Sequence, residues 1–303
     1  MKISNLIRLH WAAIRALLVL TAITGIAYPL AVWTIALLPG LHERAEGSIV
    51  TAADGKPLGS SLIGQLFTDA QGNPLPQYFQ SRPSAAGDGY DPMATSASNL
   101  GPESTVDTLG DPTRPEADNG YQASLLTLVC SRSAAIGELD GVDGRRPFCT
   151  GGGVGAVLSV IGPRDAYGNV VTPTRVVSVN EPCDTDTTPF LNTYEGVRVE
   201  CAKYGEDYSI GQIVPVRGAA PADSAVPADA VTASGSGLDP NISPAYAGLQ
   251  IQRVATARGV SATDIENAVR DNSDGRVLGF MGQPVVNVLA LNLELDQKYP
   301  LKS

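Results

Sequence analysis

The sequence predicts an α+β protein: a single N-terminal transmembrane helix followed by an extracytoplasmic α+β domain with a β-rich insertion. Three observations lead to this fold class. An uncharged apolar run occupies residues 16–38, β-branched runs bounded by turn residues fill the middle of the chain, and the last third carries capped helical patterns.

The N-terminal run is long enough to cross a membrane. A bilayer core of roughly 30 Å needs about 20 apolar helical residues, and residues 16–38 exceed that length. A cleaved secretory signal is the alternative. A signal has a shorter apolar region and ends at a small-x-small site, which the residues before Pro39 do not provide. We therefore expect residues 1–42 to form a cytoplasmic tip and a retained anchor, with a helix at about 14–38.

Charge decides the expected orientation of this anchor. Lys2, Arg8 and Arg15 precede the run, and no acidic residue occurs before Glu43. By the positive-inside rule the N-terminus stays in the cytoplasm. The sequence therefore predicts a single-pass protein of the plasma membrane whose C-terminal domain lies outside.

Gly25 and Pro29 lie inside the uncharged run, with Tyr28 between them. Glycine lets two membrane helices approach closely, and proline kinks a helix whose neighbours re-satisfy the backbone. An anchor that only tethers needs neither residue. We therefore expect this helix to pack against other membrane helices.

The portion outside the membrane is acidic. It holds all 31 acidic residues of the chain and all but three of the 21 basic ones. Nucleic-acid binding requires basic patches, and docking on anionic lipid requires clusters of Lys or Arg. The charge therefore argues against both.

Both histidines, His10 and His42, flank the anchor. The bulk of the outer portion thus lacks the histidine of a Ser-His-Asp or Cys-His triad and of a His-ligated zinc site. Carboxylate-only chemistry and a Ser-Lys pair stay open. We expect no catalytic residues and no metal site.

Four cysteines, Cys130, Cys149, Cys183 and Cys201, lie in the middle of the chain. An even number in an exported domain predicts disulfides. Three pairings are possible, and Cys130–Cys149 with Cys183–Cys201 is favoured because local loops close most cheaply. A metal site with four thiolates is the rival, but the chain has no C-x-x-C knuckle.

The elements after the anchor follow from turn and strand patterns. Residues 48–50 and 61–67 are expected to be extended around a turn at Asp54 and Gly55. Residues 154–161, 170–179 and 196–201 read as strands, 151–153 as a flexible turn, and 219–228 as an Ala/Pro-rich linker.

The last third predicts helices with clear ends. Ser243 and Pro244 begin one that stops at Gly259, and Ser261 caps a second with Asp264 at its third position. Residues 277–281 are predicted to be a strand. Residues 285–296 fit either an extended start or a helix from the outset.

Several sequence blocks recur in the same order as in a known family. They are TGIAYPL at 24–30, GSSLIGQ at 59–65, YFQSRPS at 78–84, SNLGP at 98–102, VTASGSGLDPNISP at 231–244, Gln250 with Arg253 to Ala255 and Ala257 to Gly259, QPVVNVL at 283–289, and LNL at 291–293. With these blocks the chain resembles the KdpC family, the C subunits of bacterial potassium-transporting P-type ATPases. The resemblance covers roughly residues 1–105 and 225–303.

The resemblance implies an accessory subunit of an ATP-driven, high-affinity potassium uptake pump. Implied partners are a channel-like potassium-translocating subunit, a P-type ATP-hydrolysing subunit and a small stabilising peptide. The family is described as a catalytic chaperone that raises the ATP affinity of the ATP-hydrolysing subunit, so ATP enters through the complex and no cofactor is bound tightly. Residues 43–104 and 225–303 would form the family core, and 105–224 a cysteine-containing insertion.

Some residues in these blocks have two readings. Ser234, Gly235, Ser236 and Gly237 could cradle an anion such as a nucleotide phosphate, or simply connect to the next helix. Gln250 could contact the same ligand or bond the backbone. Arg82 could pair with a carboxylate of this chain or of a partner. The alternative for the whole protein is an independent membrane-anchored binding module or carboxylate-dependent hydrolase.

Overall fold

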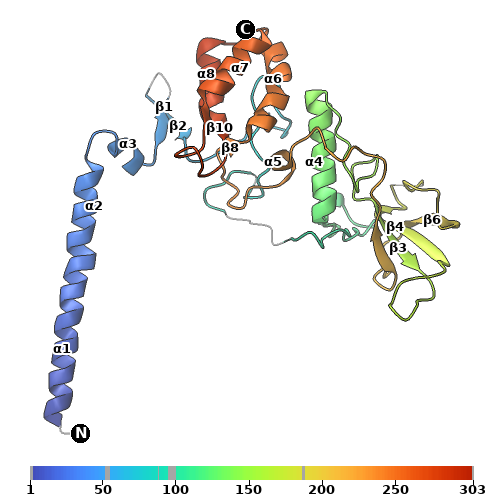
Figure 1. Cartoon of the computed structure of the whole chain (residues 1–303), viewed down its shortest axis with the longest axis horizontal. Coiled ribbons are helices and arrows are strands. Elements are labelled where there is room, and N and C mark those ends of the chain that lie inside the picture. The colour runs from blue at the N-terminus through green and yellow to red at the C-terminus, as the bar shows by residue number, and fades with distance from the viewer. Residues whose placement is uncertain (1–2, 52–54, 88, 95–99, 186–187, 302–303) are drawn as a thin grey trace. The chain divides into compact units, whose positions relative to one another are not determined.

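A computed structural model of the chain describes residues 3–51, 55–87, 89–94, 100–185 and 188–301. It combines helices with three small sheets, so the predicted α+β fold class is confirmed (Figure 1). The chain divides into two compact units, Met1–Leu62 and Ile63–Ser303.

One continuous helix makes up most of the first unit. It consists of α1 (Ile3–Ala22), a π-helical turn (Ile23–Ala27) and α2 (Tyr28–Ala36), drawn in blue in Figure 1. The 34-residue span is apolar enough to cross a membrane and is exposed along its length. It begins at Ile3 rather than near residue 14, because the Leu, Ala and Arg residues before the uncharged run also favour helix.

The π-helical turn accommodates Pro29. A proline inside a helix has no N–H to donate, and its ring crowds the carbonyl four residues earlier, which is that of Gly25. The turn widens the helix just before the proline, and the Tyr28 N–H donates to the Ile23 carbonyl. The helix therefore continues through Pro29.

The first unit ends in a short antiparallel pair of strands. After α3 (His42–Ala45) come β1 (Ile49–Thr51) and β2 (Pro57–Ser60). The extended piece predicted at 48–50 matches β1, whereas the one predicted at 61–67 is wrong, because the second strand ends at Ser60. Asp54 of the predicted turn lies outside the described residues, and Gly55 has a φ of 82°.

Three helices form the centre of the second unit: α6 (Pro244–Arg258), α7 (Ala262–Asp271) and α8 (Val288–Lys298). The Ser243 and Ser261 hydroxyls accept hydrogen bonds from the N–H groups of Tyr246 and Asp264, at 3.0 and 3.2 Å. Helix α6 ends at Gly259, whose φ of 66° is left-handed. The predicted caps and stop are confirmed.

A three-stranded antiparallel sheet accompanies these helices, in the order β8 (Asn241–Ile242), β10 (Val285–Asn287), β9 (Ser273–Asp274). In it Val286 lies opposite both Ile242 and Ser273. The ambiguous pattern at 285–296 is now explained. The chain is extended through β10 and then enters α8 directly, with the Asn287 side chain accepting from the Ala290 N–H.

The strand predicted at 277–281 is wrong. Val277 and Met281 instead close a tight turn, in which each N–H donates to the other's carbonyl at 2.9 Å. The apolar side chains that suggested a strand are exposed at this turn.

The core of the second unit lies among the helices, the small sheet and the segment around Phe79. Its largest buried apolar side chains are Phe79, Ile242, Ile265, Leu291 and Leu295. Phe79 comes from residues with no regular secondary structure, which ties that segment to the helical core.

Residues 105–224 carry a five-stranded sheet in the order β5 (Thr193–Tyr194), β6 (Val197–Ala202), β4 (Arg175–Pro182), β3 (Val157–Ile161), β7 (Gln212–Pro215). Only β4 and β6 pair in parallel. The three predicted strands correspond to β3, β4 and β6. Each face of the sheet has its own apolar cluster, one around Val177 and one around Val176.

Helix α4 (Leu125–Asp140) of the same region was not predicted. Its local signals are present: Ser124 accepts from the Thr127 N–H, and Gly141 ends the helix with a φ of 67°. Val129 and Ile136 pack against the helical core, while Leu126 packs against the sheet. Helix α4 therefore joins the sheet to the core.

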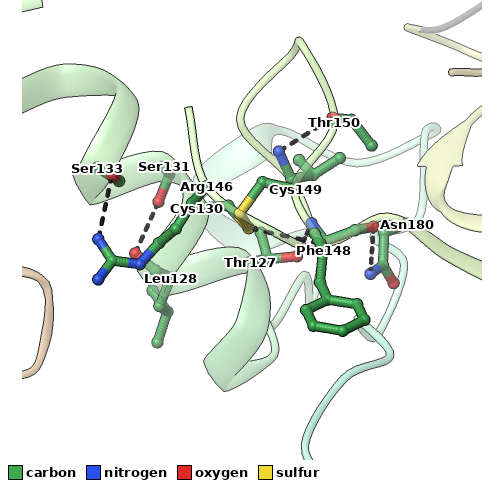
Figure 2. Close-up of a disulfide and its surroundings, with 12 residues drawn as sticks. Thr127, Leu128, Cys130, Ser131, Ser133, Arg146, Phe148, Cys149, Thr150 and Asn180 are labelled. Carbon is green, nitrogen blue, oxygen red and sulfur yellow. Dashed lines mark hydrogen bonds between the residues drawn. A yellow bond between two sulfur atoms is a disulfide. The ribbon is translucent and has the colours of Figure 1, made fainter. Parts of the chain in front are cut away.

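Two disulfides brace residues 105–224, in the pairing that the sequence favours. Cys130–Cys149 joins α4 to the loop before β3, with the Cα atoms 5.5 Å apart (Figure 2). Cys183–Cys201 joins the end of β4 to β6, with the Cα atoms 5.0 Å apart. No cysteine among the described residues is free.

Candidate functional site

Two segments that carry the recurring sequence blocks lie against each other in the second unit. One is residues 76–84, here called the clamped segment, and the other is the serine-glycine loop at 231–240. The clamped segment contains neither helix nor strand, yet Phe79 within it is fully buried. A buried backbone must find hydrogen-bond partners for its N–H and C=O groups, and here side chains supply them.

Two buried amide side chains hydrogen-bond to the backbone of the clamped segment, as a neighbouring β-strand would. Asn292 on α8 accepts from the Phe79 N–H and donates to the Phe79 carbonyl, both at 2.9 Å. Gln250 on α6 accepts from the Gln80 N–H at 2.7 Å and donates to the Gln80 carbonyl at 3.2 Å. Their exposed fractions are 1% and 0%. A primary amide has both a donor and an acceptor, so each side chain satisfies one residue's backbone completely.

Two arginines of α6 hold the first half of the clamped segment. Arg253 donates from Nη1 to the carbonyls of Pro76 and Tyr78, at 2.8 and 2.9 Å. Arg258 donates from Nε to the Gln77 carbonyl at 2.8 Å. Both guanidinium groups are thereby committed to the fold.

Arg258 has further contacts with the end of the chain. Its Nη2 lies 2.8 Å from the Asp296 carboxylate, and the guanidinium stands 5.1 Å from the centre of the Tyr78 ring. The Tyr78 hydroxyl donates to the same carboxylate at 3.1 Å, and burial is the main reason that the pKa of Tyr78 is raised. This cluster fixes the clamped segment to the end of α8.

Arg82 connects the clamped segment to the serine-glycine loop. Its Nη1 lies 2.7 Å from the Asp239 carboxylate, and its Nη2 donates to the carbonyls of Thr232 and Ala233. Arg82 therefore pairs with a carboxylate of its own chain, which is one of the two partners that the sequence allowed. The Tyr90 hydroxyl donates to the Arg82 carbonyl, and burial raises the pKa of Tyr90 to about 12.

The serine-glycine loop is closed by its own hydroxyl groups. Ser234 is buried, and its Oγ accepts from the N–H groups of Gly237 and Asp239, at 2.9 and 3.4 Å. Ser236 Oγ accepts from the Leu238 N–H at 3.1 Å. Gly235 and Ser236 are exposed. The amides of Gly237, Leu238 and Asp239 therefore have partners inside the loop, and that of Ser234 donates to the Pro83 carbonyl.

Gly237 is required where the loop meets the clamped segment. Its φ is 74°, and a Cβ atom there would lie 2.6 Å from the Ala86 Cβ. Its carbonyl accepts from Ser84 Oγ at 2.6 Å. Only glycine combines this left-handed backbone with so close an approach.

Four of the five predicted nucleotide residues, Ser234, Ser236, Gly237 and Gln250, thus have structural contacts, and the contact with a nucleotide stays a prediction. Ser234 and Gly237 hold the loop, Gln250 holds Gln80, and the Asp239 carboxylate lies among them. A cleft of about 220 Å³ lies beside the clamped segment, lined in part by Arg82, Arg132 and Tyr246. Small-molecule sites usually enclose about 300–1,000 Å³. Within the described residues, no cluster of His, Cys, Asp and Glu could hold a metal ion.

Arg253 also forms a buried ion pair between α6 and α4. Its Nε lies 2.7 Å from Asp140 Oδ1, and the two side chains are 7% and 1% exposed. The other carboxylate oxygen of Asp140 is buried and has no hydrogen-bond partner. Burial raises the pKa of Asp140, with Arg253 opposing that rise. This pair fastens α4 to the family core.

Sequence reasoning did not single out Asn292, Arg253 and Arg258 as site residues. Asn292 carried a signal, because it is the uncharged one of two polar residues inside the apolar pattern LALNLEL of α8. The other predicted site is separate: Gly25, Tyr28 and Pro29 lie on the exposed N-terminal helix, and their packing against other membrane helices stays a prediction.

Comparisons with known proteins find one family. The family model for the C chain of K⁺-transporting ATPases matches residues 10–109 and 211–297. A potassium-transporting ATPase KdpC subunit of Kineococcus radiotolerans is 36% identical over 98% of each chain. Subunits of the same name from Beijerinckia indica and Mycobacterium tuberculosis are each 33% identical, over 95% and 94% of this chain and 92% and 96% of their own.

These matches also bear on the insertion. The family model skips residues 110–210. The relative from Kineococcus radiotolerans is nonetheless aligned along almost its whole length with almost the whole of this chain. A segment of comparable length therefore occupies this position in that relative, and the insertion is not peculiar to this chain.

Proposed function

Because the chain belongs to the KdpC family, the C chains of K⁺-transporting ATPases, we propose that it acts as the accessory subunit that stabilises the pump. It does so without catalysing a step itself. We further propose that it raises the affinity of the ATP-hydrolysing subunit for ATP.

One observation carries the accessory role. In the clamped segment and the elements around it, the polar groups of the recurring sequence blocks bond one another: Gln250 and Asn292 hold the backbone, and Arg82, Arg253 and Arg258 hold carbonyls and carboxylates. Side chains used in this way build a rigid domain. Because these polar side chains hold the fold, we expect the protein to act through its surface and its N-terminal helix rather than through a reaction of its own.

The proposed partners are a channel-like potassium-translocating subunit, the P-type ATP-hydrolysing subunit and a small stabilising peptide. The helix Ile3–Ala36 is the proposed attachment to them within the membrane. Gly25 supports this role, since a Cβ at that position would meet only Thr21, at 3.9 Å. The space beside it is open to a second helix.

The proposed orientation makes the effect on ATP an indirect one. With the N-terminus in the cytoplasm, the second unit lies outside the membrane, away from cytoplasmic ATP. The chain would then act through a conformational equilibrium of the pump. Such coupling is reciprocal: a subunit that tightens ATP binding is itself bound more tightly when ATP is present, by the same factor. Direct contact of ATP with Ser234, Gly235, Ser236, Gly237 and Gln250 needs the opposite orientation.

The ATP effect is tested on the purified pump with and without this chain. We expect a lower KM for ATP when the chain is present. An unchanged KM contradicts the ATP part of the proposal. Gly235→Ala and Ser236→Ala then separate the two routes, because both positions are exposed. An indirect effect leaves their KM at the wild-type value, and direct contact raises it.

Orientation is tested by thiol labelling. After mild reduction, a membrane-impermeant thiol reagent is applied to intact and to lysed cells. Labelling of Cys130, Cys149, Cys183 and Cys201 in intact cells is the expected result. Labelling only after lysis places the second unit in the cytoplasm and favours direct contact with ATP.

A further inference from the structure

An exposed apolar turn separates α7 from α8. It consists of residues 277–282, here called the apolar tip. Val277, Leu278, Phe280 and Met281 have exposed fractions of 66%, 79%, 70% and 51%. Every residue from 273 to 284 is exposed. Scattered exposed apolar residues are ordinary, but four within five positions form a continuous patch.

Leu278 is held in a conformation that leucine disfavours. Its φ is 54°, and a residue with a Cβ loses about 1–2 kcal/mol in this left-handed region. Glycine or asparagine would fit the turn better. Next to it, the position of a Cβ on Gly279 or Gly282 has no atom within 4 Å. With 79% of its surface exposed, Leu278 itself gains little packing inside this chain to offset its strain.

Part of the backbone of the apolar tip is hydrogen-bonded within the turn. The N–H groups of Val277 and Met281 donate to each other's carbonyls, and the N–H groups of Gly279 and Phe280 donate to the carbonyls of Arg276 and Val277. Residues 277–282 include no charged side chain. An uncharged apolar turn suits the membrane interface, where water still reaches the remaining backbone groups.

We propose that the apolar tip inserts into the membrane interface as a second, shallow attachment of this chain. The inference depends on the N-terminal helix lying in the membrane and not on the proposed effect on ATP. Residues 37–62 then keep the start of the second unit, Ile63, within at most about 90 Å of the bilayer.

The size of the tip also favours lipid as its partner. A stable protein–protein interface usually buries about 1,200–2,000 Å², far more than a six-residue turn offers. Insertion into an interface needs only a few apolar side chains when the chain is already anchored, since the anchor makes the second attachment an intramolecular event. The acidic charge of the chain excludes attraction to anionic lipid, so the contact is apolar and insensitive to salt.

Photo-crosslinking in the assembled pump tests this proposal. Benzoylphenylalanine replaces Phe280 in the full chain, the cells are irradiated, and mass spectrometry identifies the adducts. Tyr167 is the matched control, because it is an aromatic residue at another loop tip with an exposed fraction of 91%. We expect lipid adducts at position 280 and none at 167, with the same yield at high and low salt. Crosslinks from 280 to another subunit, or no adduct, overturn the proposal.

Two substitutions together distinguish membrane insertion of the turn from a purely structural role. Leu278→Asn and Phe280→Asn remove apolar groups that are mostly exposed, and asparagine tolerates the backbone at 278. We expect an unchanged melting temperature of the pump and loss of the lipid adducts from a probe at Met281. A lowered melting temperature, or adducts that persist in the double variant, contradicts membrane insertion.

Discussion

At the scale of single residues, Gln250 explains why one polar side chain belongs in a buried position. It is fully buried and pairs with both backbone groups of Gln80. The sequence left two roles open for this residue, contact with a ligand or a hydrogen bond to the backbone. In the structure its side chain bonds to the backbone. Neither reading could be chosen from the sequence, because Gln80 lies 170 positions away.

Gln250→Leu should destabilise the chain by about 3 kcal/mol, because the N–H and carbonyl of Gln80 lose their partners inside the protein. Gln252→Leu is the matched control, since Gln252 lies on the exposed side of the same helix, and its effect should stay within about 0.5 kcal/mol. Urea unfolding of both detergent-solubilised variants measures the difference. Equal midpoints would show that the amide pairing does not stabilise the fold.

Gly237→Ala tests the contact between the serine-glycine loop and the clamped segment. The left-handed backbone alone opposes alanine by about 1–2 kcal/mol, and the new Cβ would press on Ala86. We expect a loss of about 2 kcal/mol or more in thermal unfolding. Gly235→Ala, where a Cβ meets nothing within 4 Å, should have little effect. Similar losses in both variants would argue against the close approach.

At the scale of elements, helix ends were predictable and helix α4 was missed. The caps of α6 and α7 depend on residues three positions apart, so the sequence shows them directly. The same signals flank α4, at Ser124 and Gly141. The β-branched runs of the region 105–224 predicted strands alone. The regular element that joins the sheet to the core was therefore absent from the sequence-based interpretation.

The ion pair between α4 and α6 predicts an unusual dependence on pH. The pKa of Asp140 is raised, mainly by burial, from an ordinary value of 3.8. A carboxyl group whose folded pKa exceeds its unfolded pKa stabilises the fold most at low pH, and this contribution is lost as the pH rises through the folded pKa. The stability of wild type relative to Asp140→Asn should therefore fall as the pH rises from about 3.8.

Asp143, a few residues away, is a control because its pKa is shifted in the opposite direction. Its hydrogen bond with Arg145 is the main reason that its pKa is lowered to about 2. Above pH 3.8 the wild type should be more stable than Asp143→Asn, and this difference should shrink as the pH drops toward 2. Unfolding of the three proteins across this range measures both trends. Parallel curves for wild type and Asp140→Asn would contradict the raised pKa of Asp140.

At the scale of the whole molecule, the anchor is predicted to hold the chain in the pump. Gly25→Leu should not disturb the helix itself, because the space around Gly25 is open. It should prevent the close approach of a partner helix, and so lower the amount of this chain that copurifies with the other subunits. Ala31→Leu on the same span is the control. Undiminished copurification of the Gly25 variant would show that the glycine is not a packing site.

The sequence by itself determined the features that depend on near neighbours along the chain. These are the long apolar helix near the N-terminus, the caps of α6 and α7, the stop at Gly259, the strand content of the middle region and the favoured pairing of the four cysteines. The recurring blocks also identified the family. Each of these signals lies within a short stretch, where the local physics of helices, turns and loop closure acts alone.

Only the tertiary structure decided how the recurring blocks are used. Asn292 and Gln250 bond to Phe79 and Gln80 across 213 and 170 positions, and Arg253 reaches Asp140 across 113. It also decided that residues 277–281 form an exposed turn instead of a strand. Residues far apart in sequence meet only when the whole core forms, so their pairing depends on packing that no short pattern records.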